Sequence, residues 1–141
     1  MEHKLWIAVV HLMQVEACRA GGFVAFSHGK ETAVRKVTPG DRVAFYAPRD
    51  TFEGSPVQAF CGLATVTGDH VEQRPLPGTE HMPWVRDADF ETVNPMPVRP
   101  LLEELSFVRD PQHWGMAFRR SLFEVSAEDF EIIENALRGT S

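Results

Sequence analysis

Residues 21–30 read GGFVAFSHGK and bring glycines, aromatic rings and polar side chains together in one short segment. The double glycine at its start can end a helix, because glycine accepts a backbone turn at positive φ. Gly29 allows another strand or a ligand to approach the backbone closely. The segment is therefore either a recognition loop or an ordinary connection between a helix and a strand.

The two interpretations assign different roles to the two phenylalanines and the three polar residues of the segment. Phe23 and Phe26 offer flat apolar faces, and the polar residues Ser27, His28 and Lys30 offer hydrogen bonds and a positive charge. In a recognition loop, a phenylalanine stacks on a ligand and the lysine contacts a polar edge or a phosphate. In an ordinary connection, both phenylalanines belong to the core and the lysine is solvated.

The chain has the size and composition of one domain. It has 141 residues, of which 43% are hydrophobic, and this is enough for a single packed core. No apolar run approaches the ~18 residues of a membrane span, and the N-terminus does not resemble a signal sequence. We therefore expect one domain over residues 1–141, a cytoplasmic location and no membrane partner.

Charge and cysteine content narrow the function classes. The net charge of −6 argues against avid, sequence-independent binding to nucleic acid, which needs many lysine and arginine contacts. A local basic surface is compatible with this charge, because Lys and Arg residues cluster between Lys30 and Arg42. Cys18 and Cys61 lie far apart with no second pair, which predicts neither a disulfide framework nor a zinc site.

Hydrophobic periodicity and turn residues predict an α+β domain. Residues 5–10 are expected to form a buried strand and residues 12–20 a helix. Gly62 interrupts a β-rich segment and predicts a bulge. A capping box at Ser126 is expected to begin a final helix that ends at Gly139. Further strands are expected at 42–47, 57–67, 70–74, 84–93 and 122–125, with a short helix from Arg99. The predicted fold is a small open β-barrel of about six mostly antiparallel strands with flanking helices.

Short motifs follow one another along nearly the whole chain. They are LWIAV (5–9), GGF (21–23), HGK (28–30), GD (40–41), FYAP (45–48), QAF (58–60) with Gly62, PW (83–84) with Arg86, PVRPLL (97–102), LSF (105–107), WG (114–115), FR (118–119), FEV (123–125) and DF (129–130). The ordered set resembles the EVE domain, a member of the PUA-like group of small β-barrels that is related to YTH readers of methylated adenine and to ASCH domains. The resemblance implies a PUA-like barrel.

The resemblance also implies a function and a site. It implies a pocket that accepts a nucleobase, expected to be a modified base in DNA or RNA, through stacking, edge hydrogen bonds and a phosphate contact. Laid against the methyladenine readers, Phe23 falls on the first tryptophan of a Trp-x-Ser-Thr-x-x-Gly-Asn pattern, Gly29 on its glycine and Lys30 on its asparagine. This chain has phenylalanine in place of the tryptophan and lysine in place of the asparagine, so the resemblance does not specify methyladenine as the ligand. Phe26 is then expected in the core.

Two tryptophans are candidates for a second aromatic wall. Trp84 follows a proline-rich loop at the start of a strand, where it is either a pocket wall or a plug of the barrel. Trp114 beside Gly115 is either a pocket residue or a packed corner of the core. Trp6 belongs to the first buried strand and is expected in the core.

Several polar residues are candidates for contacts with a base edge or a phosphate. Arg119 is the first of these, and Arg120 is expected to point the opposite way. Arg86 is a further candidate for a phosphate contact, together with the lysine of the loop. His28 either faces the pocket or caps the turn. Tyr46 either faces the pocket or contacts a neighbouring strand. The complete predicted ligand-binding set is Phe23, Ser27, His28, Lys30, Tyr46, Trp84, Arg86, Trp114 and Arg119.

We expect a reader rather than an enzyme. The histidines show no ligand-like spacing with acidic residues, so no metal, cofactor or catalytic residue is predicted. One alternative is an ASCH-like amidohydrolase that acts on a modified nucleoside through Lys30, and another is a module for a small molecule or a protein. The resemblance also suggests a separately encoded nuclease or helicase as partner. The protein is expected to be a monomer.

Overall fold

The apolar run near the N-terminus forms a central strand of the sheet. The computed structural model describes residues 3–139, and in it β1 (Leu5–Val9) lies between β3 (Arg42–Arg49) and β8 (Leu122–Glu124). β1 runs parallel to β3 and antiparallel to β8. The three central residues of β1 are buried, as expected for a strand that is covered on both faces.

β3 and β4 (Pro56–Val66) form the long antiparallel hairpin of the sheet. Their register shifts by one residue beside Gly62, so that Cys61 forms a bulge. A Cβ atom at position 62 would lie 3.1 Å from the side chain of Val15, so glycine lets the first helix lie close to the strand. The bulge predicted at Gly62 is confirmed.

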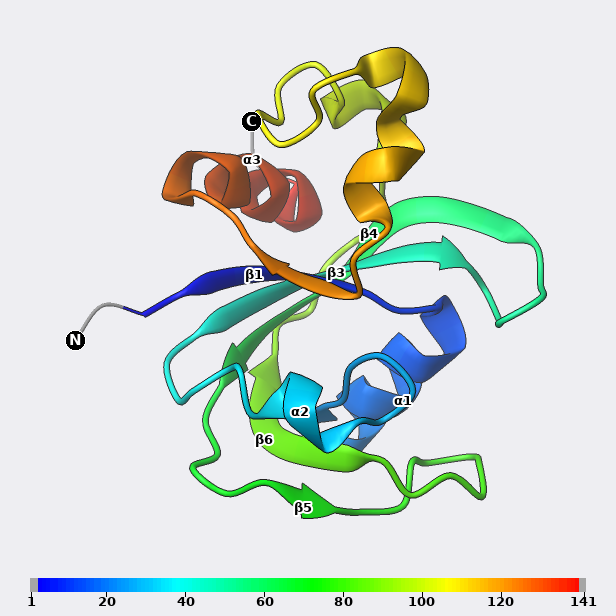
Figure 1. The fold of residues 1–141 in the computed structure, drawn as a ribbon, viewed down its shortest axis with the longest axis vertical. Coiled ribbons are helices and arrows are strands. Elements are labelled where there is room, and N and C mark those ends of the chain that lie inside the picture. Colours follow the sequence, from blue (N-terminus) through cyan, green and yellow to red (C-terminus); the bar gives the residue numbers. More distant parts are fainter. Residues whose placement is uncertain (1–2, 140–141) are drawn as a thin grey trace.

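Shorter strands complete a curled sheet. β6 (Trp84–Phe90) pairs with the end of β4 and also with β2 (Phe23–Val24). β5 (Glu72–Gln73) pairs with β6, and β7 (Met96–Pro97) pairs with β4. The order β2-β6-β4-β3-β1-β8 curls into a half-barrel (Figure 1), which confirms the predicted open barrel. β2 and β7 lie outside the predicted strands, because two residues are too few for a periodic pattern.

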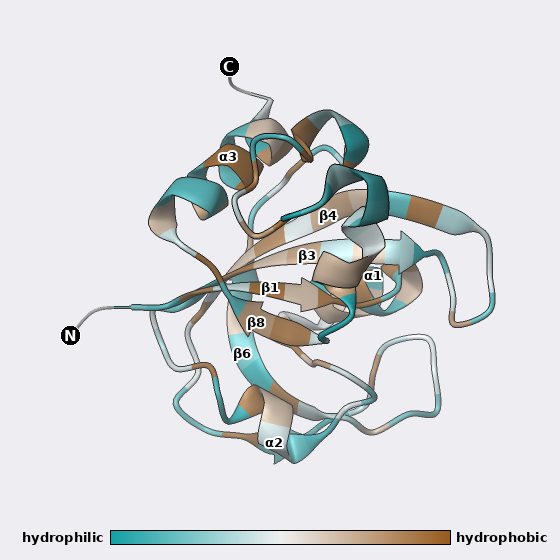
Figure 2. Cartoon of the chain, turned by 45° about the horizontal axis from the view of Figure 1, so that its top comes forward, coloured by the Kyte–Doolittle hydropathy of each residue, from teal (hydrophilic) through white to brown (hydrophobic). Residues whose placement is uncertain are grey.

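Helices cover both faces of this sheet. α1 (Leu12–Gly21) and α2 (Glu31–Val34) lie on one face, and α3 (Ala127–Arg138) lies on the other with the 3-10 segments η1 (Arg99–Leu101) and η2 (Pro111–Phe118) (Figure 1). Figure 2 shows hydrophobic residues along the central strands and hydrophilic residues on the outer turns of α3. None of the helices within the described residues has the length and apolar character that a membrane crossing requires.

Alternate residues of β3 belong to two hydrophobic cores. Phe45 packs with Val15 in the core on the α1 side, and Tyr46 packs with Ile133 in the core on the α3 side. Successive side chains of a strand point to opposite faces, so one strand supplies both cores. Trp6 is 7% exposed and belongs to the α1-side core, as expected.

The cap of α3 differs from the expected capping box in one respect. The hydroxyl of Ser126 accepts a hydrogen bond from the backbone N–H of Asp129 at 3.2 Å, which is the expected half. The carboxylate of Asp129 does not return to the cap. It accepts hydrogen bonds from the backbone N–H and the hydroxyl of Ser106 at 2.9 and 2.6 Å. Asp129 therefore anchors α3 to the segment that precedes η2.

Candidate functional site

A hollow of about 450 Å³ opens beside the carboxyl ends of the parallel strands β1 and β3. We call it the first hollow. One wall is formed by residues 25–30, the second part of the segment 21–30; we use the name recognition loop for residues 25–30 only. Another wall is the turn between β3 and β4. The lining residues are Val9, Val10, His11, Ser27, His28, Lys30, Pro48, Arg49, Thr51, Phe52 and Ser121.

Two glycines and a backbone hydrogen bond shape the chain from the end of α1 through the recognition loop. Gly22 ends α1 in the left-handed conformation with φ of 73°, as the double glycine predicts. Gly29 has φ of 80°, and a Cβ atom there would lie 2.8 Å from the Cα atom of Pro83. The carbonyl of Gly29 accepts a hydrogen bond from the backbone N–H of Trp84 at 3.0 Å. The segment leading into β6 is therefore the part of the chain that approaches Gly29 closely.

Polar and aromatic groups face the first hollow from this loop. The hydroxyls of Ser27 and Ser121 share a hydrogen bond of 2.8 Å. The carbonyl of His28 lies 3.2 Å from the ring Nε2 of His81. The ring of His28 meets the ring of Phe52 edge-on, with 6.0 Å between the ring centres. Phe52 is 69% exposed, so most of its ring is uncovered by protein.

His11 adds a polar edge to the first hollow. It is half-buried, and its Nδ1 atom is buried without a hydrogen-bond partner in residues 3–139. Burial lowers the pKa of the His11 ring, and charge repulsion from His28 lowers this pKa further. The imidazole is therefore neutral at physiological pH and carries one hydrogen-bond donor and one acceptor.

The charged residues of the lining are basic. Lys30 and Arg49 are both exposed, and a guanidinium nitrogen of Arg49 donates to the carbonyl of Gly54 at 3.3 Å. Among the residues that line the first hollow there is no aspartate or glutamate. The hollow thus combines an apolar floor, a neutral imidazole, hydroxyls and basic residues.

Two of the predicted site residues lie inside the fold. Phe23 is 2% exposed, packs with Cys18 and Val85, and has the guanidinium of Arg74 at 5.1 Å from its ring centre. Arg86 is 7% exposed and donates to the backbone carbonyls at positions 34 and 68, at 3.3 and 3.1 Å. Burial lowers the pKa of the Arg86 guanidinium. Neither residue lines the first hollow.

Trp84 and Tyr46 also lie away from the first hollow. Trp84 is half-buried and packs against the core on the α1 side. Tyr46 is 1% exposed on the α3 side of the sheet, where its ring stacks on Phe118 with 4.2 Å between the ring centres. Burial raises the pKa of the Tyr46 hydroxyl to about 12, although nearby Arg99 acts in the opposite direction.

A second hollow, of about 640 Å³, lies between η2 and residues 106–110. Trp114 belongs to its lining and has the guanidinium of Arg99 at 5.4 Å from its ring centre. Arg119 is exposed and lines neither hollow, whereas Arg120 lines the second one. Arg119, for which we expected a pocket contact, is thus outside both linings, and its neighbour Arg120 belongs to one of them. Arg119 is the C-cap residue of η2 and has helical φ and ψ.

The first hollow brings together three of the predicted residues, Ser27, His28 and Lys30. Sequence reasoning missed His11 and Phe52. A signal for Phe52 exists, because it is a large apolar side chain in an otherwise polar turn. His11 directly follows the first buried strand, but nothing in its local sequence distinguishes a pocket residue from a helix cap.

The chain is similar to known proteins along nearly its whole length. The EVE domain family model matches residues 4–136. The chain belongs to the EVE domain family. A UPF0310 protein of Mycobacterium avium is 35% identical over 133 residues, which cover 94% of this EVE domain and 96% of the relative. The UPF0310 protein YdcG of Bacillus subtilis is 30% identical over 138 residues, with 97% and 94% covered. The family expected from the motifs is confirmed.

Solved structures show the same fold at low identity. ASCH from Zymomonas mobilis superposes on this EVE domain with a TM-score of 0.53 at 16% identity, over 92% of this chain and 93% of that one. A hypothetical protein from Leishmania major gives a TM-score of 0.55 at 17% identity, over 95% and 94%. The EVE domain therefore has the half-barrel fold of ASCH and other PUA-like domains.

Proposed function

We propose that this EVE domain is a nucleic-acid-binding module whose first hollow accepts a modified base of DNA or RNA. The observation that carries the proposal is the exposed ring of Phe52 in the same lining as the hydroxyl of Ser27 and the amine of Lys30. The family and the ASCH-like fold support the proposal, because both belong to the PUA-like group.

Stacking on the base is assigned to Phe52 rather than Phe23. The ring of Phe52 is 69% exposed, whereas the ring of Phe23 is 2% exposed and covered by its neighbours. Base stacking on an aromatic side chain contributes about 1–3 kcal/mol. The edge-on contact with His28 holds one side of the Phe52 ring and leaves the other side for a ligand.

Recognition of the base edge is assigned to His11 and Ser27. Besides the buried Nδ1 atom of His11, a neutral imidazole has one further ring nitrogen, which can supply one hydrogen bond to the edge of a base. The hydroxyl pair of Ser27 and Ser121 offers a second donor and acceptor. The apolar residues Val9 and Val10 suit an added alkyl group, which favours a modified over an unmodified base.

Lys30 and Arg49 are assigned to the phosphate. Both are exposed members of the lining, and phosphate contacts position a nucleic acid without reading its sequence. With a net charge of −6, the whole molecule gives little attraction to a polyanion, so these local cations supply the contact.

The test is a calorimetric titration with paired nucleosides, each modified base beside its unmodified parent, and with short DNA and RNA oligomers that contain them. At least one modified nucleoside is expected to bind about tenfold more tightly than its parent, a difference of about 1.4 kcal/mol. Phe52→Ala is expected to lower this affinity by the stacking contribution, about 1–3 kcal/mol.

Met82→Ala is the matched control. Met82 is a large apolar side chain that is 48% exposed and lines neither hollow, so its removal should leave the affinity unchanged. Absence of binding across the panel, or equal affinity in the Phe52→Ala and unaltered proteins, would show the proposal to be wrong. Conversion of a nucleoside to product would instead favour the amidohydrolase, for which the first hollow lacks an acidic partner of Lys30.

A further inference from the structure

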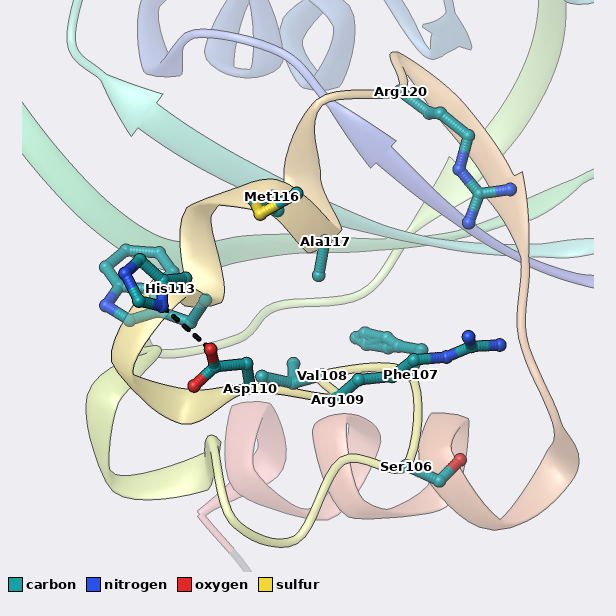
Figure 3. A pocket seen from close by; sticks show the side chains of 10 residues that line it. Ser106, Phe107, Val108, Arg109, Asp110, His113, Met116, Ala117 and Arg120 are labelled. Carbon is teal, nitrogen blue, oxygen red and sulfur yellow. Dashed lines mark hydrogen bonds and ion pairs between the residues drawn. The ribbon is translucent and has the colours of Figure 1, made fainter.

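The second hollow has arginines at one end and an acidic residue at the other (Figure 3). Arg109 and Arg120 lie toward the same end, with the ring of Phe107 beside them. Asp110 and His113 lie at the opposite end. The hollow is therefore polarised, with its positive end next to β8.

Both arginines are available to a ligand. Arg109 is exposed, and the guanidinium of Arg120 lies 4.6 Å from the ring centre of Phe123. Neither guanidinium forms an ion pair with a carboxylate in the described part of the chain. An arginine held over a ring keeps its N–H groups free in the plane of the guanidinium, where they bind phosphate oxygens in pairs.

The one acidic group of the lining is already engaged. The carboxylate of Asp110 accepts hydrogen bonds from the backbone N–H of Gln112 at 3.0 Å and from the ring of His113 at 2.7 Å. The bond from His113 and the bond from Gln112 hold the pKa of Asp110 below its usual value. Asp110 thus forms a local cap of η2 at the far end and leaves the arginine end positive.

The linings of the two hollows include consecutive residues of the chain. Arg120 lines the second hollow and Ser121 lines the first, and these residues are consecutive in the chain. Consecutive Cα atoms are about 3.8 Å apart, less than the span of one nucleotide in an extended strand. The edges of the two linings therefore come close together at Arg120 and Ser121.

We propose that the second hollow is an adjoining nucleotide subsite, in which Arg109 and Arg120 bind the phosphate next to the base held in the first hollow. This inference rests on the proposed function, and it names the ligand as an oligonucleotide rather than a free nucleoside. Phe107 and Ala117 supply the apolar floor for the sugar or base attached to that phosphate.

The test compares a nucleoside with a trinucleotide that carries the same base, in the unaltered protein and in the double variant R109A/R120A. The double variant is expected to bind the trinucleotide at least tenfold more weakly and the nucleoside with unchanged affinity. Its slope of log affinity against log salt should be smaller by about one to two units, because two phosphate contacts are lost. K36A is the control for loss of a surface charge, because Lys36 is exposed and lines neither hollow.

Trp114 provides an independent signal, because it lines the second hollow and not the first. The trinucleotide is expected to change tryptophan fluorescence in the unaltered protein, and W114F should abolish most of this change without altering nucleoside affinity. Unchanged trinucleotide affinity and salt slope in R109A/R120A, with nucleoside binding intact, would overturn the second subsite alone. Failure of the unaltered protein to bind any nucleoside or trinucleotide would overturn the proposed function itself.

Discussion

The hydroxyl oxygens of Ser27 and Ser121 lie 2.8 Å apart and join the recognition loop to the start of β8. Ser27 has φ of 56°, a left-handed conformation that is unfavourable for a residue with a side chain. Such a conformation costs about 1 kcal/mol or more and persists where the surroundings hold it in place. The bond to Ser121 is one such constraint, and it lies within the first hollow.

Two substitutions at this position separate backbone strain from the hydrogen bond. Ser27→Ala and Ser27→Gly both remove the hydroxyl, but only glycine adopts positive φ without a Cβ penalty. We expect Ser27→Gly to have the higher free energy of unfolding, by about 0.5–1 kcal/mol. Urea denaturation measures both values, and equal stabilities would show that φ at position 27 stores no strain. Both variants should bind a nucleoside more weakly than the unaltered protein.

Two glycines with the same φ test the close approach of the recognition loop to the segment before β6. Gly29 and Gly78 both have φ of 80°, but a Cβ atom at Gly29 would meet Pro83, whereas none is within 4 Å at Gly78. Gly78→Ala is expected to cost about 1 kcal/mol from the left-handed conformation alone. Gly29→Ala is expected to cost about 1–3 kcal/mol more from overpacking. Thermal unfolding of both variants measures the difference, and equal costs would contradict the contact.

The pH dependence of stability is expected to report on Asp41. Burial alone would raise the pKa of this carboxyl, but hydrogen bonds from the backbone N–H of Lys4, the indole of Trp6 and the backbone N–H of Thr38 leave the pKa lowered. A lowered folded pKa contributes stability above the unfolded pKa and loses it as the pH falls through the folded value.

Asp41→Asn is therefore expected to lower the free energy of unfolding at pH 7 by about 1–3 kcal/mol. The difference between the two proteins should shrink as the pH falls below the usual aspartate range. Urea denaturation at a series of pH values measures this. A difference that stays constant over that range would contradict the assigned pKa direction.

The single tyrosine gives a direct measure of burial on the α3 side of the sheet. Burial raises the pKa of Tyr46 to about 12, so its hydroxyl should remain protonated through the pH range in which an exposed tyrosine ionises, near 10. The stability that this group contributes is present below the unfolded pKa and is lost as the pH rises through about 12. Ultraviolet absorbance of the phenolate, followed with circular dichroism, tests this expectation. Ionisation near pH 10 in a folded protein would contradict it.

Local patterns in the sequence predicted the elements that are formed by neighbouring residues. Gly22 ends α1, Gly62 marks the bulge of β4, and the segment from Ser126 to Gly139 contains the last helix. Each of these depends on φ preferences, hydrogen bonds or apolar spacing within a few residues. The motif order over the chain also identified the family and the open barrel.

The candidate site could be predicted only in part, because it depends on pairings between distant segments. Phe23 resembles a stacking residue in the sequence, but pairing of β2 with β6 buries its ring. Phe52 lies in a polar turn, and it meets His28 only because the sheet brings that turn beside the recognition loop. The local sequence does not show that β2 pairs with β6 or that the turn of Phe52 lies beside the loop of His28. From local sequence alone, each phenylalanine could therefore be either buried or exposed.

The parallel pairing of β1 with β3 couples the ligand binding proposed for the first hollow to complete folding. The chain between these strands comprises the 32 residues 10–41. Closing a loop of this length costs on the order of 3 kcal/mol in chain entropy. The first hollow lies at the end of this pair and also takes Ser121 from the far end of the sequence. In the proposed function, a nucleoside therefore binds the state in which both parts of the chain are in place. Bound nucleoside should accordingly raise the global unfolding free energy by the full linkage amount.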